Sequence, residues 1–427
     1  MSLADDPTSV PPQLPSSFAA LRHRNFRLLW SGMIVSTAGS MMQNAAILWH
    51  VTQLVPVADR PLALGMVGAV KIVPIVLFSL LGGVVADALD RRKLMLVMQC
   101  LMTVFAAVLA LLTFTGREAL WSIYLLTALN SAANSFDGPA RQAMLPALVP
   151  PKDFPNAISL NTVHFQVASV VGPWLAGVVI AWLGMGWVYA LNAASFLAVI
   201  LNLVRMRDVP ERQGAASAVS LHSALEGLRF VFRTPMIRST MLLDFFATFF
   251  SSATGLLPIF AQDILRVGPR GYGLLVSAQA IGAVSASAFL VHAADRIDRR
   301  GRTLLLAVTG YGLATVLFGV SRSFALTFAC LALVGASDMV STVLRNIIRQ
   351  LGTPDRLRGR MTSVNMVFFM GGPQLGEIEA GVVAHAFGAP FSVVSGGLGC
   401  LAAAIWIAAK TPALRRYRRD DPALEAA

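Results

Sequence analysis

Ionisable side chains stand inside long apolar stretches of this chain, and these are the residues whose types could do chemistry. Asp244, Lys71, Glu377 and Glu379 are the clearest cases. A charge at the centre of a bilayer costs at least ~2.5–3.5 kcal/mol, so such residues normally face a water-filled cavity or a partner. A carboxylic acid in a dry site can exchange its proton near neutral pH, which suits coupling to a proton gradient. We therefore expect substrate binding or proton transfer inside a membrane; a structural buried ion pair is the alternative for each residue.

The spacing of these residues limits how they can act together. Lys71 has no acid three or four positions away, so it must meet a partner on another helix, reach water or lose its charge. Glu377 and Glu379 point to different faces of a regular helix, although the Gly371-Gly372-Pro373 break before them can change that. His164 is more typical of a packing histidine than of a proton relay.

Four apolar stretches also carry polar residues three or four positions apart, which places each set on one helical face. The sets are Ser36, Ser40 and Gln43; Asn130, Asn134, Asp137 and Arg141; Asp244, Thr248 and Ser251; and Asp338, Thr342, Arg345 and Arg349. We interpret these faces as the lining of a central aqueous path. Contacts between helices and snorkelling arginines are the alternative, and for Arg141 and Arg349 the two interpretations have equal weight.

The elements that must position these residues are membrane-spanning helices. The 427 residues are 56% hydrophobic and 13% charged, whereas soluble domains carry about a quarter charged residues. A bilayer core of ~30 Å requires roughly 20 apolar residues per helix. Twelve stretches meet this requirement: 28–54, 62–86, 94–114, 119–141, 157–183, 187–205, 237–264, 272–294, 303–320, 324–348, 361–386 and 390–410. The predicted fold class is an all-α membrane protein with twelve transmembrane helices.

The net charge of +12 fits either nucleic-acid binding or the basic bias of cytoplasmic loops. Of the 34 basic residues, 25 fall in the tails, the linker and one alternate set of loops, and five fall in the opposite loops. Lys and Arg mark the cytoplasmic side, so we expect both termini inside and no nucleic-acid partner.

The chain divides six plus six around a basic linker. We expect a disordered tail over 1–20, a helical bundle over 21–205, a cytoplasmic linker over 206–235, a second bundle over 236–411 and a cytoplasmic tail over 412–427. The first apolar run is too long for a signal peptide, so we interpret it as the first transmembrane helix. In the linker, Leu221, Leu225, Leu228 and Phe232 have helical spacing, which fits a helix on the membrane surface or one packed on the protein's own cytoplasmic face.

Three cysteines, Cys100, Cys330 and Cys400, lie far apart in or beside apolar runs. They form no disulfide framework and no zinc-ligand spacing, so we expect no metal and no cofactor.

The two halves share motifs at a fixed offset of 208 residues. The segment Ala86-Asp87-Ala88-Leu89-Asp90-Arg91-Arg92 matches Ala294-Asp295-Arg296-Ile297-Asp298-Arg299-Arg300, and Arg141-Gln142 matches Arg349-Gln350. Gly172-Pro173 matches Gly372-Pro373 at an offset of 200. Such a repeat is parallel, and substrates of parallel-repeat transporters bind near the midplane between the halves.

The segment from Gly83 to Arg92 resembles the signature of the major facilitator superfamily between its second and third helices. The resemblance implies a cytoplasmic gate formed by Gly83, Asp87, Arg91 and Arg92 and, in the second half, by Asp295, Arg299 and Arg300. This sequence departs from the signature at Ala88, where a basic residue is usual, and at Asp90, where Gly is usual.

The fifth stretch resembles the antiporter signature of the same superfamily, with Gly172, Pro173 and Gly177 in place and Ala at two Gly positions. Small residues there allow close helix approach, and Pro bends the helix. Further segments at 25–30, 137–142 and 376–381 are similar to the subgroup that contains the enterobactin exporter and related bacterial effluxers. The resemblance implies a monomer in the inner membrane that exports a small lipophilic or siderophore-like molecule by proton antiport.

Two other functions stay open at the level of sequence: a facilitator or importer of the same fold, and a non-transporting membrane sensor. No phosphate-loop, H-E-x-x-H or G-x-S-x-G motif is present, and no soluble segment is long enough for a separate active site. We therefore expect a transporter and not an enzyme.

The predicted orientation can be tested with reporter fusions. Green fluorescent protein fused after Ala427 is expected to fluoresce, because it would fold in the cytoplasm. Alkaline phosphatase inserted at Gly116 is expected to be active, because it folds only outside. Active phosphatase at the C-terminus would contradict the orientation.

Overall fold

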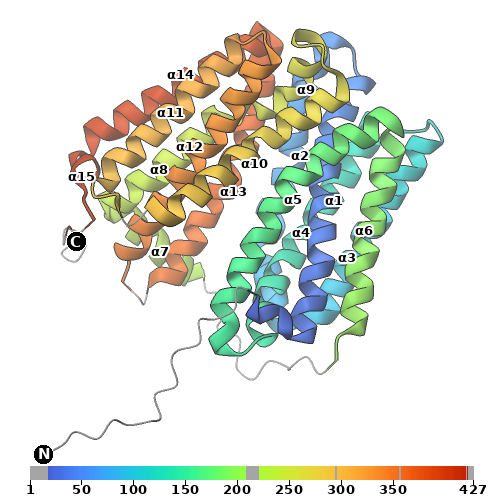
Figure 1. The fold of residues 1–427 in the computed structure, drawn as a ribbon, viewed down its shortest axis with the longest axis horizontal. Helices are drawn as coiled ribbons and strands as arrows, with labels where there is room; N and C mark the ends of the chain where they lie inside the picture. The colour runs from blue at the N-terminus through green and yellow to red at the C-terminus, as the bar shows by residue number, and fades with distance from the viewer. Residues whose placement is uncertain (1–17, 208–220, 294–295, 355–356, 420, 422–427) are drawn as a thin grey trace, which may run out of the picture.

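The computed structural model describes residues 18–207, 221–293, 296–354, 357–419 and 421. For some helical residues in these ranges it describes the backbone but not the side chain, namely 79–84, 86–88, 221–225, 227, 253, 363, 367 and 370. Most of the expected tail 1–20 and residues 208–220 of the linker lie outside the description. The described ranges consist of helices and short connections, as Figure 1 shows.

The first half is a bundle of six long helices, drawn in blue to green in Figure 1. They are α1 (Arg24–Leu54), α2 (Arg60–Ala88), α3 (Arg91–Phe114), α4 (Leu120–Met144), α5 (Phe154–Trp182) and α6 (Met185–Arg205). Short 3-10 turns precede or follow them at η1 (Ala19–Arg22), η2 (Val57–Asp59), η3 (Leu145–Ala147) and η4 (Pro151–Asp153). Asp90 caps α3 by accepting hydrogen bonds from the backbone N–H groups of Arg92 and Lys93, which gives a physical role to the residue that replaces Gly in the signature.

The second half repeats this arrangement in yellow to red. Its elements are α8 (Pro235–Phe250), η5 (Ser252–Leu256), α9 (Leu257–Ile259), η6 (Phe260–Ile264), α10 (Gly268–Ala293), α11 (Arg300–Val320), α12 (Phe324–Leu351), α13 (Arg358–Phe387), α14 (Ala389–Lys410) and α15 (Pro412–Arg416). The predicted fold of twelve spans in two similar bundles is confirmed.

The seventh span is not one continuous helix. After α8 the chain passes through a 3-10 turn, one turn of α-helix and the π-helical segment η6. Pro258 lies in the first turn of α9, where its missing N–H costs least. π-helical turns are often found at functional sites, and this one lies where the two halves meet.

Equivalent helices pack in equivalent ways in the two halves. The pairs α1–α5, α2–α4 and α3–α6 of the first half correspond to α8–α13, α10–α12 and α11–α14 of the second. The two most extensive helix contacts between the halves, α2–α13 and α5–α10, also correspond to each other. This is the packing that the parallel repeat predicts.

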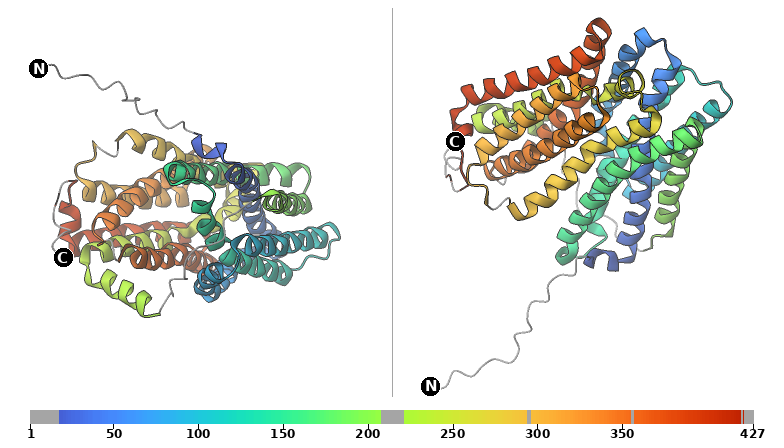
Figure 2. Two further views of the ribbon diagram at one scale, coloured as in Figure 1. Left: turned by 90° about the horizontal axis from the view of Figure 1, so that it is seen from below. Right: turned by 45° about the horizontal axis from the view of Figure 1, so that its top comes forward.

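Twelve spans bring both ends of the described chain to one side, which we call the terminal side; the opposite side is the far side. On the far side the halves touch through glycines. A Cβ on Gly273 would lie 2.6 Å from the carbonyl oxygen of Pro173, and one on Gly381 would lie 2.6 Å from that of Pro61. Helix backbones can approach this closely only where no side chain intervenes. Toward the terminal side α5 and α10 diverge (Figure 1 and the right panel of Figure 2).

By length and composition, nine helices of the described residues are apolar enough to cross a membrane. The three long helices outside this set are α1, α4 and α13. Each carries several of the polar residues singled out above, which lower its mean hydropathy. Two of these three helices, α1 and α4, carry polar faces that the sequence predicts to line an aqueous path.

The linker contains helix α7 (Leu221–Arg233), which packs on the protein itself. Phe230 and Val231 contact an apolar cluster of α8 and α13, and Glu226 forms an ion pair with Arg360. The side chains of Leu221 and Leu225 lie outside the described residues. Leu228 and Phe232 stay exposed, so part of α7 also faces away from the bundle.

Candidate functional site

A cavity of about 790 Å³ lies in the first half and reaches the terminal side. Helices α1, α2, α4 and α5 supply most of its wall, and Gln374 of α13 contributes from the other half. It extends from Lys71 in the middle of α2 to Gln142 at the terminal end of α4. Seven of the residues proposed from sequence line it: Ser36, Ser40, Lys71, Asn130, Asn134, Asp137 and Arg141.

The wall of this cavity is both polar and aromatic. Ser36, Thr37 and Asn161 add hydrogen-bonding groups, while Trp30 and Phe165 add aromatic surface. Such a mixed lining is typical of sites for small organic molecules.

Asp137 is buried in this wall and accepts a hydrogen bond from Gln99, 3.0 Å between Nε2 and Oδ1. Because Gln99 belongs to α3, this hydrogen bond fixes the orientation of α4, and little of the Asp137 side chain is exposed to the cavity.

Gln43 does not line this cavity, although it shares the predicted stripe of α1. Asn192 of α6 donates a hydrogen bond to its Oε1 at 2.8 Å. Gln43 therefore joins two helices of the first half, which is the alternative that the sequence left open.

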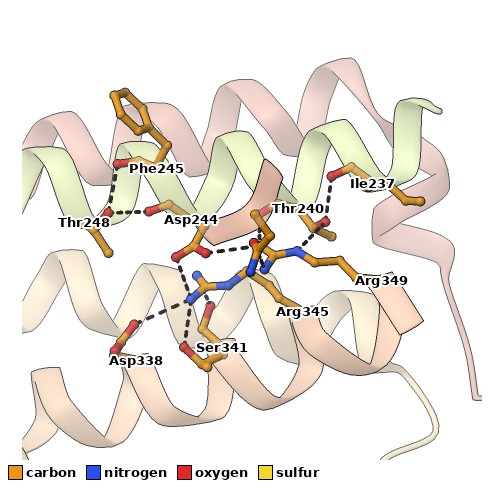
Figure 3. Close-up of polar contacts among 11 residues, drawn as sticks. Ile237, Thr240, Asp244, Phe245, Thr248, Asp338, Ser341, Arg345 and Arg349 are labelled. Atoms are coloured by element: carbon orange, nitrogen blue, oxygen red, sulfur yellow. Dashed lines mark hydrogen bonds and ion pairs between the residues drawn. The ribbon is translucent and has the colours of Figure 1, made fainter. Parts of the chain in front are cut away.

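The polar residues of the second half form a buried network instead of a cavity wall (Figure 3). The Asp244 carboxylate lies 2.9 Å from Nη2 of Arg345 and 3.2 Å from Nη2 of Arg349. All three side chains are at most 3% exposed. Asp338, whose side chain is 45% exposed, lies 3.7 Å from Arg345 and is the weaker acidic partner.

Hydroxyl and amide groups complete this network. Arg345 donates to Ser341 and Thr342 on its own helix, and Arg349 donates to Thr240 and Asn365. Thr248 donates to the Asp244 backbone carbonyl and so supports α8 locally. The expectation that Asp244 and Arg345 face the cavity is not met in this structure; they tie α8 to α12.

Glu377 lies at the contact between the halves. Cβ atoms added at Gly68 of α2 and Gly255 of η5 would lie 2.9 Å from its Cβ and 3.3 Å from its Cγ. Its Oε2 is buried and has no hydrogen-bond partner among the described residues. Lys71 is near enough to act on the Glu377 carboxylate electrostatically, but no ion pair within 4.0 Å joins the two. Glu379, two residues on, has no partner within hydrogen-bond distance in the described part of the chain.

The expected gate is described only in part. Arg92 donates from Nε to the Leu203 carbonyl at 2.8 Å, and Arg91 donates to the Ala143 carbonyl. Both arginines therefore donate hydrogen bonds to carbonyl groups at the C-terminal ends of α6 and α4. At Gly83 and Asp87 the structure describes the backbone alone, and Asp295 lies outside the described residues.

In the second half Arg299 precedes α11, and Arg300 begins it. Arg300 is 9% exposed, and its Nε has no hydrogen-bond partner among the described residues. The gate role of these residues stays a prediction.

The antiporter-like motif has two packing roles. A Cβ on Gly172 would lie 2.6 Å from the Ala38 carbonyl oxygen of α1, so this glycine allows α5 to pack inside its own half. Gly177 faces Gly273 across the halves, and Pro173 lies inside α5.

A far-side latch joins the halves and was not anticipated from the sequence. Arg60 donates from Nη1 to both carboxylate oxygens of Asp263, at 2.9 and 3.1 Å. Gln262 of η6 donates to Thr52, and the Tyr272 hydroxyl donates to the Ala45 carbonyl. The residues of the latch come from the ends of separate spans, and no periodic pattern connects them.

Two parallel six-helix bundles with a polar cavity define a secondary transporter of the major facilitator fold. The chain belongs to the family of transmembrane secretion effectors, whose model matches residues 15–422. Its members are multi-pass membrane transporters of small molecules and not enzymes.

Relatives with similar sequences include the enterobactin exporter EntS of Shigella boydii serotype 18, which is 29% identical over 351 residues. EntS of Escherichia coli strain SMS-3-5 is 28% identical over the same length. Each match covers 81% of this chain and 83% of the relative.

Solved structures with similar folds include an inward-facing, unoccupied bacterial homologue of the human lysosomal transporter Spinster. Its TM-score is 0.70 at 13% identity, covering 92% of this chain and 96% of that one. The nucleoside transporter NupG gives a TM-score of 0.69 at 14% identity, covering 91% and 99%. At these identities the likeness shows the fold alone.

The buried network predicts a strong effect of Asp244→Asn on stability. Without the carboxylate, Arg345 and Arg349 stay buried and charged, and Asp338, 3.7 Å from Arg345, is the acid that remains nearby. Leaving a buried charge without its partner typically costs about 3–5 kcal/mol. We expect the thermal unfolding midpoint of the purified protein to fall by at least about 5 °C. Asp338→Asn is the matched control and is expected to shift the midpoint much less, because its side chain is half exposed. Equal midpoints for Asp244→Asn and the unchanged protein would contradict the role of the network.

Proposed function

We propose that this protein exports a small molecule across the bacterial inner membrane by alternating access, driven by proton antiport. The observation that carries the proposal is the asymmetry between the two sides. The cavity reaches the terminal side, whereas the latch and the glycine contacts close the far side. If the terminal side is cytoplasmic, as the basic loops predict, this state accepts substrate from inside the cell. The named function of the EntS relatives, enterobactin export, supports the same direction.

Alternating access requires the far-side contacts to open while the terminal side closes. The latch is suited to this because Arg60 and Asp263 are partly exposed, with side-chain exposures of 17% and 37%. Exposed pairs of this kind contribute at most about 1 kcal/mol, so the latch can break at small cost. The buried Asp244 network, by contrast, lies inside the second half, and breaking it would leave buried charges unpaired, so we expect it to stay intact while the halves rock.

Glu377 is the residue we propose for proton coupling. Its carboxyl group is enclosed between α2, α13 and η5 only while the far side is closed. Burying the charged form in that contact is costly, so closure of the far side favours the protonated form. When the far side opens, the carboxyl group meets water and can take up a proton from outside.

Return to the present state would carry that proton inward. Lys71 lies on the cavity side of Glu377 and stabilises the carboxylate once the proton leaves toward the cavity. The charged carboxylate then weakens the far-side contact and favours outward opening. One proton therefore enters for each outward step, which is antiport.

Export can be tested in everted membrane vesicles, whose cytoplasmic face is outward. A screen of dyes, antibiotics and siderophores in a host without other pumps would identify a transported compound. We expect vesicles that contain the protein to accumulate this compound when a proton gradient is imposed, and not after an uncoupler collapses it. Accumulation that is indifferent to the gradient would favour a facilitator, and uptake into intact cells would favour an importer.

The coupling proposal predicts different effects for two neighbouring acids. Glu377→Gln should abolish gradient-driven accumulation but leave exchange of internal for external substrate, because a neutral side chain cannot carry the proton. Glu379→Gln is the matched control on another face of the same helix and should keep gradient-driven accumulation. Full gradient-driven transport by Glu377→Gln would remove it as the coupling residue.

A further inference from the structure

Arg141 stands in the cavity wall with unused hydrogen-bonding capacity. A guanidinium group has five N–H donors in a planar fork. Among the described residues this group makes one hydrogen bond, from Nη1 to the Met33 sulfur at 3.8 Å. No carboxylate lies within 4.0 Å of it there, and its side chain is part-buried.

The repeat provides an internal comparison. Arg349 is the equivalent residue of the second half, 208 positions later. It donates to Asp244, to the Thr240 backbone carbonyl and to Asn365, and it is buried. The fold therefore satisfies one member of the pair with its own acceptors and leaves the other facing the cavity.

The acid near Arg141 does not supply a hydrogen bond to it. Asp137 lies one helical turn away and acts on Arg141 electrostatically, but it is 1% exposed, accepts its hydrogen bond from Gln99 and forms no ion pair within 4.0 Å of the guanidinium group. Of the remaining ionisable groups in the wall, Lys71 is a second cation and His164 is buried, with its Nδ1 unpartnered in the described part of the chain. The cavity is thus lined by two cations, Lys71 and Arg141, and by one acid, Asp137, which already accepts a hydrogen bond from Gln99.

The surroundings of Arg141 add apolar surface next to the charge. Trp30 and Phe165 line the same cavity, and Asn161 offers an amide for further hydrogen bonds. A ligand that satisfies this set has an acidic oxygen-bearing group joined to an aromatic or apolar body.

We propose that the transported substrate is an amphipathic acid and that Arg141 binds its oxyanion, a carboxylate, sulfonate or phosphate group. This inference rests on the proposed function, because it names the substrate class of the same cavity. Arg141 then selects substrates by charge, while the aromatic residues accept the apolar part. The alternative is an arginine that is merely solvated by water in the mouth of the cavity.

The test compares 2-naphthoate with its neutral analogue 2-naphthamide as ligands of the purified full-length protein in a neutral detergent. Affinity is measured from ligand-induced tryptophan quenching and, independently, from the shift of the unfolding midpoint. The unchanged protein should prefer the acid by about tenfold or more, because a charge-assisted hydrogen bond is lost in the amide. Arg141→Gln should remove this preference, and Arg141→Lys should keep part of it, since Lys retains the charge without the fork.

Arg229→Gln is the matched control, because it removes one exposed arginine from α7, outside the cavity. It should leave the preference unchanged. Equal affinity for acid and amide in the unchanged protein, no binding of either, or a preference that survives Arg141→Gln would overturn the proposal. Displacement of 2-naphthoate by phosphatidylglycerol from the unchanged protein but not from Arg141→Gln would assign the site to lipid headgroups and overturn it as well.

The substrate-class proposal and the export proposal can fail independently of each other. Vesicles that export only neutral or cationic compounds would overturn the substrate class and leave export standing. An Arg141-dependent preference for the acid in a protein that exports nothing would overturn export and leave the oxyanion site standing.

Discussion

On the far side, helix backbones of the two halves approach each other so closely that this contact sets where the halves separate. Glycines at both crossings, Gly177 with Gly273 and Gly65 with Gly381, let α5 meet α10 and α2 meet α13 without intervening side chains. Because the halves touch there, they diverge toward the terminal side and leave the cavity between that side and Lys71. The same contact encloses Glu377, so the accessibility of its proton depends on whether the halves are closed.

The cost of burying a charge in a medium of low dielectric explains the buried network of the second half and the polar cavity of the first. Asp244 compensates two guanidinium groups and so joins α8 to α12. The first half has Ser36 where the second has Asp244, so no carboxylate is available to Arg141 at that position. The repeats also differ at Asn130 and Asp338 and at Asp137 and Arg345, so the second half has the paired charges of a buried network where the first half has a polar cavity.

Part of the site could be predicted from the sequence. Helical spacing identified the cavity faces of α1 and α4, and Ser40, Asn130 and Asn134 line the cavity as expected. Helical spacing gave a wrong prediction for Gln43, which accepts a hydrogen bond from Asn192 instead of lining the cavity. Spacing shows that a residue belongs to a polar face, but not whether its side of that face contacts a neighbouring helix. The latch between Arg60 and Asp263 could not be predicted either, since it joins irregular segments 203 residues apart.

The number of spans, their parallel repeat and the helical faces that carry polar residues can be read from the sequence alone. These properties are local: they follow from the length needed to cross a bilayer and from 3.6 residues per turn. Which polar faces meet a cavity, and which meet each other, depends instead on how the helices pack. That choice depends on contacts such as Asp244 with Arg349, 105 residues apart, which form only when packing brings two helices together in low dielectric.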